Sequence, residues 1–535
     1  MNWKAHFLVK VAAIYLAVPF TLMLVVVKSH SSNANSELQQ SNDLKAQSLP
    51  LGKLNQPQSR QSAQIAPGLT HTVIVKGEKS ERDFYTVDVA FSADLSAANA
   101  TAESLRSNGY QPRIQTVKNR VPDDLELSVL GYLVRAGAFA TEAEAINLRE
   151  QLAAAGYLGL RVVYTGEDGE KTTGPWVVNV LEVDPAQFQG KVTAALATQI
   201  LPGNEPLTQI SSRTNAIAAV NGGYFIIGAA DGTPGDLAGI SIIGGFLVSE
   251  AVNRRTSLIL SSSSGSDARI AAISSGQRAI ASNGATRAVD GLNRKPGLIR
   301  GCGGVGGDEP TQSPKHDFTC TDSSELILFT PIFGQNAQPA SGLEVTLNES
   351  GRVTQLRQQC GGYIPKDGLV LCGTGDAAEW LQTNAQTGAK IEIDTRVLAD
   401  DEELPLVEGL KVVNGGPQLL RNGEIKITAN AEGFNWQENP EFYYRFGVRR
   451  NPRTLAGITP EGKLLLVTVD GRQPGWSVGA SFTESALIMR SLGAVDAVNL
   501  DGGGSTSMTI NQQLVNRPSD TAGERPIADS IIIEP

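Results

Sequence analysis

The spacing of hydrophobic and polar residues follows a pattern that occurs twice in the N-terminal part of the chain. Each copy begins with an alternating apolar stretch, typical of a strand, and continues with the three-to-four-residue spacing of a helix. Each copy then reaches a Gly-Tyr pair, so that Tyr85 and Tyr110 are 25 residues apart, as are Tyr132 and Tyr157. Two strand–helix–strand copies predict a small domain over residues 80–166, with one sheet and its helices on one face.

Runs of β-branched and aliphatic residues predict a second, larger domain over 175–535, whose first strand is Trp176–Val183. Three later runs end in an asparagine followed, directly or within three residues, by glycines, over 216–223, 411–416 and 494–504. Glycines bring backbone N–H groups together without side-chain bulk, and successive N–H groups can form a concave anion site. Each loop taken by itself also fits an ordinary tight turn.

The pattern between residues 463 and 501 predicts a helix between two strands. A strand over 463–470 is followed by Ser481 and Glu484, which fit a capping box at the start of a helix, and then by a strand over 495–500. Strands joined by such a crossover run parallel. Asp470 and Asp501 are therefore expected at the same edge of the sheet, with their backbones about 5 Å apart if the strands are neighbours.

The first 70 residues predict export followed by a spacer. Lys4 and Lys10 precede an apolar run over 11–27, so residues 1–28 fit either a secretion signal or an uncleaved membrane anchor. Residues 29–70 are rich in Gln, Ser and Asn and predict a disordered linker. Both alternatives place the rest of the chain outside the cytoplasm, in the periplasm or cell envelope. An uncleaved segment would anchor it in the inner membrane.

Composition excludes several classes of chemistry. The chain has 535 residues and a net charge of −10, which argues against nucleic-acid binding. Of its four histidines, only His316 lies in the bulk of the chain, so a His-rich zinc site is not expected. Ser505 does not lie in a G-x-S-x-G elbow, which argues against a serine hydrolase. Carboxylates, amides, arginines and backbone groups are left to carry the chemistry.

The four cysteines predict disulfides. They lie within about seventy residues of one another and form no C-x-x-C pair, so metal-clamp spacing is absent. An even number in an exported chain favours two bridges, and sequential pairing joins Cys302 to Cys320 and Cys360 to Cys372. Other pairings and buried free thiols remain as alternatives.

The repeated pattern resembles the SPOR domain. The resemblance rests on Gly137-Ala-Phe139 in the second copy and on the matched Gly-Tyr endings, whereas the first copy has Ala90-Phe91 without the glycine. It implies binding to peptidoglycan, with a preference for glycan strands stripped of their peptides. The alternative is a general α+β module without affinity for glycans.

The larger domain resembles the phosphodiester glycosidases, over about 175–535 and most strongly from 411 onward. The motifs that carry the resemblance follow in family order: Asn221-Gly-Gly-Tyr-Phe, Asn414-Gly-Gly-Pro, Arg450-Asn-Pro-Arg453-Thr, Val469-Asp470-Gly-Arg472, Asn499-Leu-Asp501-Gly-Gly-Gly-Ser505 and Pro518-Ser-Asp520. The family reaction breaks a sugar C1–O–P linkage and releases free sugar and a phosphate monoester. Little matches between Phe225 and Lys411, which leaves the substrate open.

This resemblance implies roles for individual residues. Asp501 is the first choice for the carboxylate that acts at the sugar carbon, followed by Asp470 and Glu484; the capping box offers a structural role for Glu484. Arg450 and Arg453 are expected to hold the phosphate, with help from the Gly502–Gly504 amides. The predicted substrate-binding residues are Asn221, Gly222, Gly223, Tyr224, Asn414, Gly415, Gly416, Arg450, Arg453, Asn499, Gly502, Gly503, Gly504 and Ser505. The alternatives are turn formation for Asn221 and Asn414, a solvated basic turn for the arginines and core packing for Tyr224.

The sequence thus predicts a mixed α+β protein: a small SPOR-like βαβ-repeat domain followed by a large α/β catalytic domain with a mixed sheet. The expected function is an exported hydrolase that cleaves sugar-1-phosphodiesters in envelope or cell-wall glycopolymers and binds peptidoglycan glycan strands. One alternative is a non-catalytic glycan-binding or scaffold protein, and another is an enzyme that cleaves a different bond, such as a phosphodiester at phosphorus. No cofactor and no metal site are predicted, although a calcium ion near Asp501 would suit the chemistry.

Overall fold

The computed structural model describes residues 48–535 except 54, 125–128, 253, 262–266 and 303–313. The predicted signal or anchor over 1–28 and the first part of the predicted linker lie outside the described residues. Within the described ranges, no helix is both long and apolar enough to span a bilayer.

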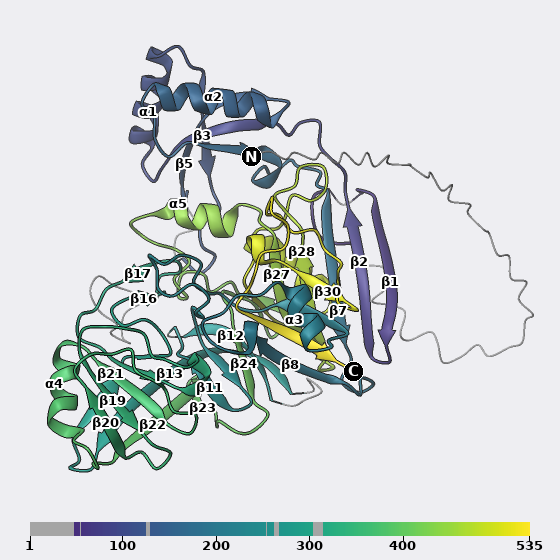
Figure 1. Ribbon diagram of the computed structural model, residues 1–535. Coiled ribbons are helices and arrows are strands. Elements are labelled where there is room, and N and C mark those ends of the chain that lie inside the picture. The colour runs from purple at the N-terminus through teal and green to yellow at the C-terminus, as the bar shows by residue number, and fades with distance from the viewer. Residues whose placement is uncertain (1–47, 54, 125–128, 253, 262–266, 303–313) are drawn as a thin grey trace, which may run out of the picture. The chain divides into compact units, whose positions relative to one another are not determined.

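The repeat module has the architecture that its sequence predicts, with helices α1 (Leu95–Ser107) and α2 (Glu142–Ala154) on the same side of one sheet (Figure 1). The strand order is β4 (Pro112–Val117), β5 (Gly131–Phe139), β3 (Tyr85–Ser92) and β6 (Arg161–Tyr164), and all neighbours are antiparallel. Each helix therefore connects two parallel strands that are separated by a strand of the other copy. A capping box of Thr141 and Glu144 starts α2.

The main sheet begins before the repeat module. Its strand order is β1 (Gln58–Ala66), β2 (Leu69–Lys76), β7 (Trp176–Val183), β28 (Leu464–Val469), β27 (Arg453–Ile458), β29 (Asp496–Asn499), β25 (Gln418–Arg421) and β26 (Glu424–Ile425). The prediction of a disordered linker over 29–70 is therefore wrong from Gln58 onward, because β1 and β2 form a hairpin that extends β7. The repeat module is an insertion between β2 and β7.

Neighbouring strands of the main sheet run antiparallel at every described pairing, so this sheet is not the predicted mixed one. Parallel pairing occurs instead between Gly291–Leu292 and Leu326–Phe329 in a smaller sheet of the same domain. Helix α6 (Phe482–Ser491) connects two parallel strands, β28 and β29, as predicted. However, β27 lies between them, so they are not neighbours. The backbones that lead to Asp470 and Asp501 are therefore two strand spacings apart, about 10 Å.

Two further sheets complete the core of the larger domain. One has the order β31 (Gln513–Leu514), β30 (Met508–Ile510), β9 (Ala218–Asn221), β32 (Asp529–Glu534) and β8 (Lys191–Leu196), with helix α3 (Leu207–Arg213) packed on it. The other has the order β11 (Phe246–Ser249), β10 (Ser241–Ile243), β24 (Lys411–Asn414), β12 (Arg255–Leu260), β13 (Ala268–Ala281), β22 (Ile391–Ala399) and β23 (Glu402–Glu403), with β14 (Thr286–Val289) on β13. Aliphatic residues from all three sheets form one buried cluster.

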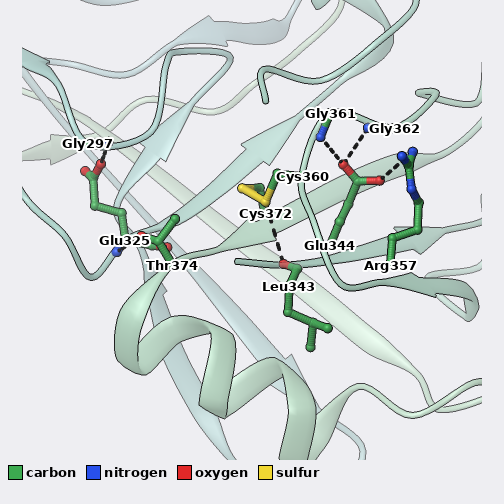
Figure 2. The surroundings of a disulfide bond; sticks show 10 residues. All are labelled: Gly297, Glu325, Leu343, Glu344, Arg357, Cys360, Gly361, Gly362, Cys372 and Thr374. Atoms are coloured by element: carbon green, nitrogen blue, oxygen red, sulfur yellow. Dashed lines mark hydrogen bonds and ion pairs between the residues drawn. A yellow bond between two sulfur atoms is a disulfide. The ribbon is translucent and has the colours of Figure 1, made fainter. Parts of the chain in front are cut away.

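A smaller sheet carries one of the disulfides. Its order is β15 (Gly291–Leu292), β18 (Leu326–Phe329), β21 (Leu369–Gly373), β19 (Leu343–Leu347) and β20 (Val353–Arg357), with helix α4 (Gly375–Asn384) packed on β19 and β21. The bridge from Cys360 to Cys372 holds the 360–362 turn over β19, where Glu344 accepts the N–H groups of Gly361 and Gly362, each at 2.8 Å (Figure 2). The second bridge joins Cys302 to Cys320. The predicted sequential pairing is confirmed.

Candidate active site

A pocket of about 180 Å³ lies where loops from distant parts of the larger domain meet. The loops follow β9, β28 and β29, precede β27 and β32, and flank β16 (Ile299–Arg300) and β17 (Thr319–Cys320), a short antiparallel pair. The side chains and glycines that line the pocket are Tyr224, Phe225, Ile227, Ala238, Arg255, Arg300, Gly301, His316, Asp317, Arg445, Phe446, Asn451, Arg453, Arg472, Asp501, Gly502, Gly503, Gly504 and Arg525. The lining is rich in arginine and includes the carboxylates of Asp317 and Asp501.

Asparagine side chains connect the pocket loops to one another. The buried amide of Asn221 donates to the carbonyl of Asp501 at 2.8 Å and accepts from Thr454 Oγ1 at 2.6 Å. Asn414 Oδ1 accepts the N–H of Tyr224 at 2.8 Å, and Asn499 donates to the Tyr224 hydroxyl at 2.7 Å. The predicted motifs therefore converge at one site. These three asparagines lie behind the lining, however, where they support Asp501 and Tyr224.

The glycines of the first two motifs allow close packing. A Cβ on Gly222 would lie 2.3 Å from Asp529 Oδ1, and one on Gly223 would lie 2.3 Å from Asn414 Nδ2. Their N–H groups bond to the carbonyl and carboxylate of Asp529, and the N–H of Gly416 bonds to a carbonyl. Because protein acceptors already occupy these donors, the predicted anion-binding concavity does not form from them. Gly415 lies against the carbonyl of Asn499, which leaves no room for a side chain.

The triple-glycine loop lines the pocket, but two of its amides are also occupied. The N–H of Gly502 bonds to Asp501 Oδ1 at 2.8 Å, and that of Gly503 bonds to the Pro452 carbonyl at 3.0 Å. This corrects the prediction that these two amides hold phosphate. Gly504 has no room for a side chain, because a Cβ there would lie 2.2 Å from the Arg525 guanidinium. Ser505 is buried behind the loop.

Asp501 lies in the pocket wall, and a second aspartate lies behind it. Burial raises the pKa of Asp501 to about 6. Asp529 is fully buried, and burial together with the negative charge of Asp501 raises the pKa of Asp529 to about 7. At neutral pH, Asp501 is therefore mostly ionised, while about half of the Asp529 carboxyls still carry a proton.

Two buried arginines give the pocket its positive charge. The Arg255 side chain is buried, and its Nε and Nη2 atoms have no hydrogen-bond partner among the described residues. Arg453 donates to the carbonyls of Ala480 and Phe446, and burial lowers the pKa of Arg453 to about 10. Both guanidinium groups remain charged at neutral pH, and a buried charge without a partner strongly favours an anionic ligand.

Arg450 and Glu484 contact each other and do not line the pocket. Their side chains form an ion pair with Nη2–Oε1 and Nε–Oε2 distances of 2.7 and 3.0 Å, outside the pocket lining. Glu484 also completes the capping box with Ser481 at the start of α6, as the sequence pattern predicts. Arg450 uses its remaining donors on the carbonyls of Gly166 and Gly169. These contacts are structural, and the roles of the two residues in phosphate binding and catalysis stay predictions.

Asp470 is also outside the pocket lining. Its fully buried carboxylate accepts hydrogen bonds from Trp476 Nε1 at 2.8 Å, Asn516 Nδ2 at 3.2 Å and the N–H of Arg517 at 3.1 Å. Burial raises the pKa of Asp470 above its ordinary value. These bonds join the loop after β28 to the loop after β31, so the geometry favours a structural role over the predicted catalytic one.

Several residues that line the pocket were not predicted from the sequence, because they lie between Phe225 and Lys411, where the family motifs match least. Asp317 has a positive φ of 59° and forms an ion pair with Arg300 at 2.8 Å. His316 packs against the rings of Tyr224 and Phe434, and burial lowers the pKa of His316 to about 3, so it is neutral at physiological pH. His316 was noted from the sequence as the one available imidazole. The other residues carry no sequence signal beyond their residue type.

Among the described residues, no group of three or more His, Cys, Asp or Glu side chains is arranged to hold a metal ion. This finding neither supports nor excludes the calcium ion that the sequence leaves open near Asp501.

Comparisons with known proteins match both parts of the chain. The family model described as phosphodiester glycosidase matches residues 341–534, and the SPOR domain model matches residues 81–162. The N-acetylglucosamine-1-phosphodiester alpha-N-acetylglucosaminidase of Mus musculus is 32% identical over 167 residues, covering 30% of this chain and 31% of the mouse protein. The Bos taurus protein of the same name is 34% identical over 194 residues, covering 35% and 34%. The chain thus spans about a third of the length of these curated relatives.

One solved structure matches nearly the whole chain. A crystal structure of a Burkholderia pseudomallei protein is 33% identical and superimposes with a TM-score of 0.84, covering 91% of this chain and 98% of that one. The likeness therefore includes the inserted repeat module as well as the larger domain. With the ordered motifs and both family models, it shows that the chain belongs to the phosphodiester glycosidase family and contains a SPOR domain.

Proposed function

We propose that this protein is an exported hydrolase that cleaves sugar-1-phosphodiesters in envelope or cell-wall glycopolymers, releasing free sugar and a phosphate monoester. The observation that carries the proposal is the pocket in which Asp501 shares the lining with Arg255 and Arg453. The Asp501 carboxylate among buried guanidinium groups suits a substrate in which a phosphate is attached directly to a sugar carbon. The enzymes that the curated relatives are named for act on such a linkage.

In this reaction the arginines bind the phosphodiester, and their charge stabilises the phosphate monoester as the C1–O bond breaks. Arg255 contributes most, because its buried Nε and Nη2 atoms have no protein partner among the described residues. The ionised Asp501 stabilises the positive charge that develops at C1. A water oxygen then becomes the hydroxyl group on C1. His316 forms part of the pocket wall and is neutral, so it contributes no charge to phosphate binding.

The test is turnover of N-acetylglucosamine 1-(4-nitrophenyl phosphate) by the purified full chain and by Asp501→Asn, with products identified in ¹⁸O-labelled water. We expect the label in the released sugar, and kcat lower by at least about a hundredfold in Asp501→Asn. Asp401→Asn changes an exposed carboxylate and serves as the matched control. Label in the phosphate would show cleavage at phosphorus instead. Binding without turnover would favour the alternative of a non-catalytic glycan-binding protein.

We further propose that the SPOR domain binds peptidoglycan glycan strands and keeps the enzyme in the periplasm or cell envelope. Both disulfides fit an oxidising compartment outside the cytoplasm. Sedimentation of the full chain with purified peptidoglycan tests the binding. We expect co-sedimentation to increase when stem peptides are removed from the strands, and equal recovery with and without peptides would contradict the proposal.

A further inference from the structure

A second hollow, of about 510 Å³, adjoins the pocket on the side of the SPOR domain. It shares five lining residues with the pocket, so the two form one continuous groove: Asp317, Arg445, Phe446, Asn451 and Arg472. The lining of this second hollow also includes Arg161 from strand β6 of the SPOR domain. The inserted domain therefore contributes directly to the surface that leads away from Asp501.

This part of the groove has more positive than negative charge to offer a ligand. The carboxylates of Glu167 and Asp317 are already paired with Arg449 and Arg300. Arg161, by contrast, is half-buried, and its guanidinium forms no hydrogen bond or ion pair within the described part of the chain. Burial and the nearby charge of Arg445 lower the pKa of Arg161.

Two more guanidinium groups line the groove beside Arg161. Arg472 is bonded to the neutral side chain of Asn451 at 2.8 Å. Arg445 lies 3.7 Å from its nearest carboxylate, that of Glu441. Arg161 and Arg445 repel each other, and of these three arginines only Arg445 pairs with a carboxylate among the described residues, that of Glu441. A bound anion would therefore stabilise the group.

The SPOR wall of the groove is firmly attached to the catalytic domain. Asp168 accepts hydrogen bonds from Arg135 and from the Tyr444 hydroxyl, and Phe91 stacks on Tyr444 at a ring distance of 5.4 Å. The main-chain N–H of Arg450 also bonds to the carbonyl of Glu167. Because these contacts lie near Arg161 and Arg445 in the sequence, they fix the segments that carry the two arginines relative to one another.

We infer that this groove binds a second phosphate of the substrate, so that the preferred substrate is a polymer of sugars joined through phosphates, with Arg161 as one phosphate ligand. The inference rests on the proposed function and adds a substrate class to it. A neutral glycan strand would leave the cationic groups desolvated without compensation, whereas a phosphodiester accepts hydrogen bonds from guanidinium groups. In this arrangement the SPOR domain takes part in substrate selection.

The test compares two synthetic probes. The first carries N-acetylglucosamine on one phosphodiester with a methyl ester, and the second carries one additional sugar-phosphate unit in place of the methyl group. Binding of each to the full-length Asp501→Asn protein is measured by calorimetry, alone and combined with Arg161→Gln. Arg149→Gln, on the exposed surface of α2, is the matched control. Thermal unfolding confirms that each variant is folded.

We expect the two-phosphate probe to bind at least about tenfold more tightly, equivalent to 1.4 kcal/mol, and this preference to be lost in Arg161→Gln but kept in Arg149→Gln. Its binding should also weaken more steeply with added salt than that of the one-phosphate probe. Equal binding of both probes, or a preference that survives Arg161→Gln, would overturn the inference. Failure of the wild type to hydrolyse either probe, with the binding preference intact, would overturn the proposed function and retain the second phosphate site.

Discussion

Burial changes the protonation of the two aspartates at the centre of the site. Asp501 borders the pocket, whereas Asp529 lies behind it and accepts the N–H of Gly223 at 2.8 Å. Each has a raised pKa, and the negative charge of Asp501 adds to the effect of burial on Asp529. The two aspartates therefore lead to two predictions: activity should fall as the pH drops, and stability should fall as the pH rises.

The activity of the enzyme is expected to fall as the pH drops through about 6. The reaction needs the ionised form of Asp501, whose pKa is raised to about 6 by burial. His316 has a pKa lowered to about 3 by burial and does not titrate in this range, and a phosphodiester stays anionic throughout. The measurement is kcat/KM between pH 4 and pH 8. A profile without an inflection between pH 5 and pH 7 would remove Asp501 from the catalytic step.

Asp529→Asn is expected to stabilise the protein at pH 8. The folded-state pKa of Asp529 is about 7 and exceeds the unfolded value of about 4, so the folded form binds the extra proton and loses stability as the pH rises between these values. Asparagine keeps an oxygen for the N–H of Gly223 and carries no charge. Thermal unfolding should show a rise in Tm at pH 8 and a much smaller difference at pH 4. Asp401→Asn is the exposed control, and equal Tm changes at both pH values would contradict the assignment.

At the scale of elements, the two disulfides have different relations to the site. The bridge between Cys302 and Cys320 connects the segments that carry Gly301 and Asp317, both in the pocket lining. The bridge between Cys360 and Cys372 lies in the smaller sheet, outside the pocket lining. Closing loops of this length stabilises a fold by about 3 kcal/mol in the chain-entropy model.

Replacing either cysteine pair by serine should therefore lower stability by a similar amount, but only one replacement should strongly affect catalysis. We expect Cys302→Ser with Cys320→Ser to raise KM and lower kcat, because Arg300 and Asp317 lose their common support. Cys360→Ser with Cys372→Ser is the matched control for stability. Denaturant unfolding and steady-state kinetics measure the two effects. An equal loss of kcat/KM in both double variants, measured on folded protein, would contradict this division.

Sequence patterns predicted the elements better than the site. The alternation and helical spacing of the repeat module, strand 176–183 and the capping box at Ser481 correspond to observed elements, because these features depend on local spacing. The order of strands depends on distant pairing, so the insertion of β27 between β28 and β29 had no local signal.

Residue roles within the site depended even more on tertiary contacts. Asp470 and Asp501 occupy similar sequence contexts, after a strand and before glycine, yet only Asp501 lines the pocket. Arg450 and Arg453 are three residues apart, and β27 begins at Arg453, so their side chains enter different surroundings. His316 and Arg255 have no neighbouring motif that identifies them. The residue types therefore indicated which chemistry is available, whereas the tertiary structure determines which of these residues line the pocket.

At the scale of the whole molecule, the SPOR domain is an insertion bonded to the catalytic domain. Strands β1 and β2 precede it and β7 follows it, all in one sheet. The buried ion pair of Arg135 with Asp168, the Tyr444 hydroxyl and the Arg449–Glu167 pair lie at the contact. Breaking a buried ion pair by removing one partner typically costs about 3–5 kcal/mol.

The described part of the chain should therefore unfold as one cooperative unit. Scanning calorimetry of the full chain is expected to show a single main transition, because the two domains stabilise each other through this contact. Asp168→Ala removes the carboxylate shared by Arg135 and the Tyr444 hydroxyl, while Asp88 still pairs with Arg135. The change should lower the Tm or separate a second transition. Two well-separated transitions in the wild type, unaffected by Asp168→Ala, would show that the contact does not couple the domains.

Lys76 and Trp176, where the chain leaves and rejoins the main sheet, face each other across the β2–β7 ladder. Such partners in antiparallel strands have Cα atoms only about 5 Å apart. Recombination at these two codons would replace the whole insertion without displacing a strand of the catalytic body. Evolution can thus exchange the accessory domain of such an enzyme, and a transplanted domain must match the surface around Tyr444 to remain fixed.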